Sequence, residues 1–117
     1  MKDEYLDYVE DIIKAMDDAL TFIEGINYEE FLKDRKTVYA VIRTLEIIGE
    51  ATKNIPSTVK GRYEEIPWKD MAGMRDKMIR GYFGVDLKRV WSTVNKDIPS
   101  LKPRFEKILK ENEKSTV

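Results

Sequence analysis

The stretch RKTVYAVIRTLEIIGEATKN, residues 35–54, decides the fold class of this chain. Its apolar residues recur at spacings of three and four, the period of an amphipathic α-helix. They are Val38, Val41, Ile42, Leu45 and Ile48, flanked by Ala40, Ile47 and Ala51. The width of this apolar face predicts the most buried helix of the molecule. Gly49 lies within it and would let a second helix approach closely.

The segments on both sides of this stretch have the same helical period. We expect a first helix over residues 3–24 that stops at Gly25, a connector over 27–32 with room for one turn, and Asp34 as the N-cap of the central helix. Residues 55–66 read as a polar loop with a short turn near 57–60. A third long helix should begin at Pro67 and end at Gly81 and Gly84. Asp86 should cap a fourth helix, with a break or kink near 95–100 at Pro99 and a final helix to about residue 113.

These segments predict an all-α, up-and-down bundle of four to five helices, because no alternating strand pattern occurs anywhere in the sequence. A length of 117 residues fits one domain over residues 1–117. No apolar run is long enough to cross a membrane, and the first residues carry no apolar signal region. We therefore expect a cytoplasmic protein that does not enter the membrane.

The composition excludes several kinds of site. The chain has no cysteine and no histidine, which removes disulfides, thiolate metal sites and the usual general base near neutral pH. No glycine-rich phosphate loop occurs either. We predict no metal and no cofactor. Acid–base chemistry would have to use carboxylates, lysine, tyrosine or arginine.

Charge gathers in the stretch from Met74 to Asp86, MRDKMIRGYFGVD. Arg75, Lys77 and Arg80 supply three cations, and Tyr82 adds a hydroxyl and a ring between two glycines. Arginine suits phosphate and aromatic rings stack on bases, so the stretch would suit RNA. The alternative is a helix end whose cations complement the helix dipole.

The position of Arg75 on the predicted third helix is unusual. It falls on the apolar stripe after Met71, where an unpaired buried charge is costly. It should therefore face a cleft, a carboxylate or a second subunit. Glu46 and Glu50, one turn apart on the central helix, are candidate partners, although ordinary surface positions explain them equally well.

The run from Gly73 to Leu87, with Val90-Trp91, Arg43–Ala51, Ile66-Pro67-Trp68 and Asp97-Ile98-Pro99, resembles the HepT-like family of small HEPN-domain proteins. The resemblance covers most of the chain. It implies a helical homodimer that acts as the toxin of a toxin–antitoxin pair. The toxin would be a metal-independent endoribonuclease, and its partner an MntA-like nucleotidyltransferase that silences it by attaching AMP to a tyrosine.

The family motif is an arginine, a polar residue, three further residues, a histidine, any residue and a tyrosine. By the resemblance, Arg75 and Asp76 match the first two positions and Tyr82 matches the tyrosine that accepts AMP. Arg75, Lys77 and Arg80 would contact RNA. The histidine position is occupied by Arg80, which stays protonated and cannot act as a general base.

The arginine at position 80 leaves two origins open. It is either a substitution introduced because an active toxin kills its expression host, or a natural feature of an inactive member. Both origins predict little or no cleavage. Two readings from other classes also stay open, namely a non-catalytic module that binds RNA or a partner, and a structural helical dimer.

Overall fold

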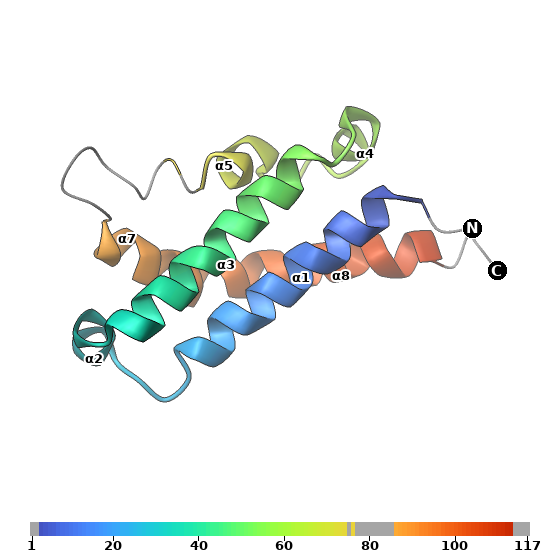
Figure 1. Cartoon of the computed structure of the whole chain (residues 1–117). Helices are drawn as coiled ribbons and strands as arrows, with labels where there is room; N and C mark the ends of the chain where they lie inside the picture. The colour runs from blue at the N-terminus through green and yellow to red at the C-terminus, as the bar shows by residue number, and fades with distance from the viewer. Residues whose placement is uncertain (1–2, 75, 77–85, 114–117) are drawn as a thin grey trace.

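The computed structural model describes residues 3–74, 76 and 86–113. Within these ranges the chain forms helices joined by short turns and has no strand, as Figure 1 shows. The helices are α1 (Tyr5–Phe22), α2 (Tyr28–Lys33), α3 (Arg35–Lys53), α4 (Ser57–Arg62), α5 (Trp68–Ala72), α7 (Leu87–Ser92), the π-helical turn η1 (Thr93–Asp97) and α8 (Ile98–Glu113). The predicted all-α bundle is confirmed.

Helix α3 is the central element of the bundle. Helices α1 and α5 both pack on it, and α8 packs along α1 (Figure 1). Its apolar face is buried as the periodicity predicted, with Val41 and Ile48 fully enclosed. A side-chain carbon added to Gly49 would lie 3.4 Å from the carbonyl oxygen of Ala72, so the backbone of α5 does approach α3 closely at this glycine.

The predicted ends of the first two long helices are confirmed. Gly25 follows α1 with a φ of 78°, a left-handed conformation that favours glycine. The side chain of Asp34 accepts a hydrogen bond from the backbone N–H of Thr37 at 3.1 Å and caps α3. The Thr37 hydroxyl donates to the same carboxylate at 2.6 Å, and these two bonds lower the pKa of Asp34. Asn27 and Glu30 form a capping box that begins α2.

Two predicted segments differ from the structure. The loop expected over 55–66 contains the helix α4, whose Val59 packs into the core and compensates for the weak helical pattern of its polar residues. The helix expected to run on from Pro67 is interrupted at Gly73, which forms a turn after α5. Met74 and Asp76 are helical again, and the predicted end at Gly81 and Gly84 lies outside the described residues.

The break expected near 95–100 is a π-helical turn, so α7, η1 and α8 form one continuous helical path. The backbone N–H of Ile98 bonds to the carbonyl of Thr93, five residues back. Pro99 explains the wider turn, because its ring lacks an N–H and would clash with the carbonyl four residues earlier in a regular helix. Pro103 lies inside α8. Both prolines are exposed on the outer side of the helix.

Polar contacts join the ends of three segments. The Tyr5 hydroxyl of α1 donates to Asn112 of α8 at 2.8 Å, and Asn112 donates to the Tyr63 hydroxyl at 3.0 Å. Tyr63 in turn donates to Glu111 at 2.9 Å. Partial burial and this bond to a carboxylate raise the pKa of Tyr63. The network ties the start of α1 and the end of α4 to the last turn of α8.

Two aromatic contacts hold the shorter helices. Trp68 of α5 packs edge-on against Phe105 of α8, with ring centres 5.5 Å apart. The ring centre of Trp91 in α7 lies 5.1 Å from the ring centre of Phe31 in α2.

No helix in the part of the chain that the structure describes is long and apolar enough to span a membrane.

The contact at Gly49 gives a test of the helix arrangement. We expect Gly49→Leu to destabilise the protein by about 1–3 kcal/mol, because the larger side chain would push α5 away from α3. Gly61→Leu in α4 is the matched control, since no atom lies within 4 Å of the carbon it would add. Urea unfolding measures both changes. Equal stability of the two variants would contradict the close approach.

Candidate functional site

A groove of about 260 Å³ lies between α3 and α5, and Gly49, at the close contact between the two helices, is part of its lining. One wall is a polar face of α3, because positions 43, 46, 50 and 53 follow one another at spacings of three and four. The opposite wall contains Ala72 and Asp76. The α3 residues that line the groove are Arg43, Glu46, Gly49, Glu50 and Lys53.

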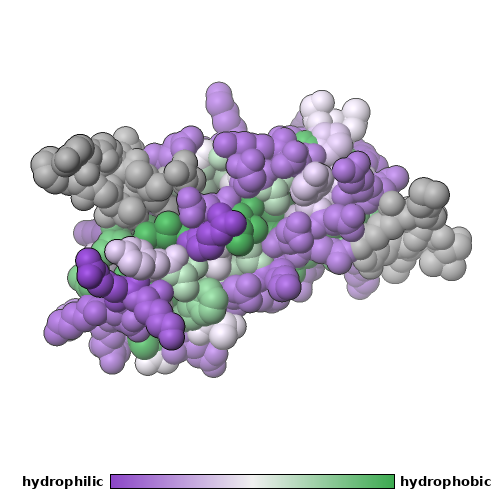
Figure 2. Space-filling view, viewed as in Figure 1, coloured by the Kyte–Doolittle hydropathy of each residue, from purple (hydrophilic) through white to green (hydrophobic). Residues whose placement is uncertain are grey.

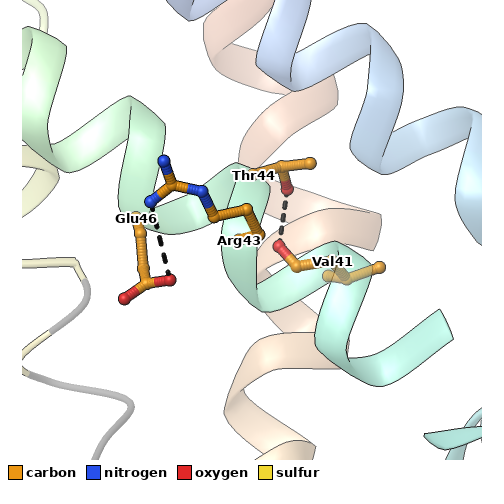
Figure 3. Close-up of polar contacts among 4 residues, drawn as sticks. All are labelled: Val41, Arg43, Thr44 and Glu46. Carbon is orange, nitrogen blue, oxygen red and sulfur yellow. Dashed lines mark hydrogen bonds and ion pairs between the residues drawn. The ribbon is translucent and has the colours of Figure 1, made fainter. Parts of the chain in front are cut away.

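Arg43 stands at the mouth of this groove. Its side chain is 70% exposed, and its Nη1 lies 4.0 Å from Oε1 of Glu46, which is 28% exposed. Figure 3 shows Arg43 and Glu46 together on one side of α3. Thr44 points away from this pair, and its hydroxyl donates to the carbonyl of Val41. An ion pair this exposed contributes at most about 1 kcal/mol, so the guanidinium can exchange Glu46 for another anion at small cost.

A second hollow adjoins the first on the other side of Arg43. It has a volume of about 210 Å³ and lies between α1 and α3. Arg43 and Glu50 line both hollows, and Tyr8 and Ile47 line only this one.

Figure 2 shows that this face of the molecule is mostly hydrophilic, with hydrophobic residues gathered in its middle. Tyr39 of α3 is 63% exposed, the largest exposed fraction among the described large hydrophobic residues.

The structure describes one residue of the predicted motif. Asp76 is exposed, helical and part of the groove wall. The other predicted site residues lie outside the described residues; they are Arg75, Lys77, Arg80 and Tyr82.

The two carboxylates proposed as partners for the motif, Glu46 and Glu50, line the same groove as Asp76. The structure therefore places both carboxylates in one groove with Asp76, and the prediction that they pair with Arg75 concerns a residue outside the described ranges. Sequence reasoning gave no role to Arg43 or Lys53. Their spacing with Glu46 and Glu50 could have revealed them, since it forms a polar stripe on the helix expected to be most buried.

The charges of the groove limit what it can bind. Arg43 and Lys53 oppose the carboxylates of Glu46, Glu50 and Asp76, so these residues carry a formal charge of −1. Such a wall does not attract a polyanion by itself. The sequence on either side of Asp76 adds the three cations of the motif, which would reverse the sign.

Comparison with known proteins identifies the family. The family described as Ribonuclease HepT-like has a model that matches residues 12–108, a range that contains the groove and the whole motif. The chain belongs to the HepT-like ribonuclease family. The resemblance seen in the motif is thereby confirmed, and RNA is the substrate class that the family name indicates.

Several relatives of the HepT-like family cover nearly the whole chain. A probable ribonuclease HepT of Thermococcus cleftensis is 56% identical over 94% of this chain and 100% of its own length. A putative RNase of Methanocaldococcus jannaschii is 49% identical over 91% of both chains. A putative RNase of Caldanaerobacter subterraneus subsp. tengcongensis is 42% identical over 87% of this chain and 91% of its own. No solved structure matches the chain.

The exposed cation at the groove mouth gives a test of RNA contact. We expect Arg43→Ala to weaken RNA binding and to reduce the slope of log K against log salt concentration by about one, the effect of losing one phosphate contact. Lys107→Ala, an exposed cation on α8, is the control. Fluorescence anisotropy with labelled RNA at several salt concentrations measures both. An unchanged slope in Arg43→Ala would remove this groove from the RNA path.

Proposed function

We propose that this HepT-like protein is the toxin of a toxin–antitoxin pair, an endoribonuclease that cleaves RNA without a metal ion. We further propose that Arg80 keeps this chain inactive. The observation that carries the proposal is the family match over residues 12–108, which contains a motif intact at Arg75, Asp76 and Tyr82 but not at its histidine position.

The proposed roles follow from the chemistry of each side chain. Arg75 would orient and stabilise the scissile phosphate, since guanidinium donors match phosphate oxygens. Asp76 would position Arg75 or its counterpart in a second subunit. A histidine at position 80 would activate the ribose 2′-hydroxyl for attack on the phosphate. Arg80 can bind phosphate together with Lys77, but it cannot accept the proton.

A homodimer would complete the site. The described wall of the groove is acidic on balance, so two copies of the motif facing each other would supply the cations that RNA requires. Tyr39, exposed beside the groove-lining residues of α3, suits burial in such an interface. We propose that the pair works in the cytoplasm.

The antitoxin would be an MntA-like nucleotidyltransferase that attaches AMP to Tyr82. An AMP group adds a negative charge and a bulky nucleoside to the motif. Both features oppose the entry of RNA, the charge by repulsion and the nucleoside by occupying space. Inhibition of the toxin would then need no change in its fold.

Restoring the motif histidine tests the catalytic role. We expect Arg80→His to cleave RNA at a rate at least about 100-fold above that of the parent chain, the scale of general acid–base catalysis. The assay uses end-labelled RNA in the presence of a chelator. The double variant Arg80→His, Arg75→Ala is the control and should lose the gained activity.

Absence of cleavage by the Arg80→His variant would instead favour the alternative function, a non-catalytic module that binds RNA or a partner. The lack of any histidine in the chain is the observation behind this alternative. Its positive sign is RNA binding by the parent chain that weakens steeply with salt and is not followed by cleavage.

The modified tyrosine has a separate test. Incubation with an MntA-like nucleotidyltransferase and ATP should add AMP to the parent chain and not to Tyr82→Phe. Intact-mass spectrometry measures the addition. Tyr39→Phe is the control, because it removes an exposed tyrosine hydroxyl outside the motif. AMP on Tyr82→Phe, or loss of the signal in Tyr39→Phe, would contradict the assignment.

A further inference from the structure

A third hollow, on the other side of α5 from the groove, has no role in the proposed cleavage. It has a volume of about 310 Å³ and lies between α5 and the continuous path of α7, η1 and α8. This volume is at the lower end of the range for small-molecule sites. The hollow is bordered by Met74, the residue before Arg75, and by Arg89, which follows closely on the end of the motif stretch.

The floor of this hollow is apolar. Met71, Met74 and Leu101 line it with at most 7% of their surface exposed. Methionine side chains adapt their shape and make favourable contacts with aromatic rings. The floor therefore suits the flat face of a ring.

The rim of the hollow carries charges of both signs. Arg89 and Arg104 contribute two guanidinium groups, and Asp70 and Asp97 contribute two carboxylates. Arg104 is held in place because its Nη1 donates to the carbonyl of Glu65 at 2.7 Å. That bond uses one of the five N–H groups of the arginine. The rim thus offers both hydrogen-bond donors and acceptors around an apolar floor, with no net formal charge.

The π-helical turn brings its residues to this hollow. In an α-helix, a residue four positions further on overshoots one turn by about 40°. The wider π turn corrects this drift, so Arg89, Thr93 and Asp97 all line the same hollow at successive spacings of four. Thr93 is 5% exposed and the other two are exposed. Such π turns occur frequently at functional sites.

Guanine matches this combination of groups better than uracil does. Its O6 and N7 accept hydrogen bonds from arginine, the commonest specific contact to a base. Its N1–H and N2–H₂ groups donate, and carboxylates accept. Uracil presents one N–H and no amino group, so it would leave the carboxylates poorly matched. Phosphate alone has no flat apolar face to place on the floor of the hollow.

We propose that this hollow is a base pocket that binds a guanine of the RNA substrate, with Met74, the residue before the cleavage motif in the sequence, in its lining. The pocket rests on the proposed ribonuclease function for its biological meaning, but the binding of the base does not require cleavage. Arg89 and Arg104 would donate to the acceptor edge of guanine, and Asp97 would accept from its donor edge. Met71 and Met74 would contact the face of the ring.

The floor methionines report on binding directly. We expect GMP to shift the NMR signals of the Met71 and Met74 methyl groups, and to bind about 5- to 150-fold more tightly than UMP, the discrimination typical of a matched base contact. Met71→Leu and Met74→Leu assign the two signals among the five methionines. Met16, fully buried in α1, should not move.

Two variants test the rim. Asp97→Asn should reduce the preference for GMP over UMP, since its amide presents a donor where the carboxylate accepted. Arg89→Gln should weaken GMP binding, because it removes one of the two guanidinium groups of the rim. Asp18→Asn, an exposed carboxylate on α1, is the matched control and should bind GMP like the parent chain. All three positions are exposed, so the fold should be kept.

Several outcomes would overturn the pocket. These are no movement of the Met71 and Met74 signals with any mononucleotide, equal shifts by GMP and UMP, or the same shifts with inorganic phosphate alone. The two proposals fail separately. Cleavage by Arg80→His, with no shift of the Met71 and Met74 signals, would reject the pocket and keep the ribonuclease function. GMP binding without cleavage by that variant would keep the pocket and reject the ribonuclease function.

Discussion

The close approach of α5 to α3 at Gly49 is the contact on which the candidate site depends. A carbon added to Gly49 would meet the carbonyl oxygens of Ala72 and Met71 at 3.4 and 3.5 Å. This glycine therefore sets the distance between the two helices. That distance brings Asp76 opposite the polar face of α3, and it leaves Met71 and Met74 on the other side of α5, facing α7 and α8. One backbone contact thus helps to place Met74 and Asp76 at two different hollows.

The two hollows beside α5 differ in chemistry, and the difference suits two parts of one ligand. The groove on α3 is lined mostly by charged residues, which would suit the backbone of a nucleic acid once the motif cations are added. The hollow on the side of α8 has an apolar floor and a rim of mixed charge, which suits a base. Phosphate contacts position a nucleic acid and base contacts select its sequence, so the short helix between the hollows would join both tasks.

Much of the fold could be predicted because the long helices carry their own signals. The apolar period of residues 35–54, the stop at Gly25 and the cap at Asp34 are local features, and the structure has each of them. The misses occurred where tertiary contacts override local preference. Helix α4 is stabilised by the burial of Val59, and Pro99 produces a π turn instead of a break because α7 and α8 both pack on the same core. Arg43 was missed for a similar reason, since its place in a groove depends on α5.

The sequence by itself determined the helical class, the central position of residues 35–54 and the family, because periodicity, caps and a motif are properties of neighbouring residues. It also showed that no histidine is available for catalysis. Only the tertiary structure decided that Glu46, Glu50 and Asp76 share one groove, and that Arg89, Asp97 and Arg104 surround a second hollow with an apolar floor. The two walls of each hollow come from separate parts of the chain, and the packing of α5 between α3 and α8 brings them together.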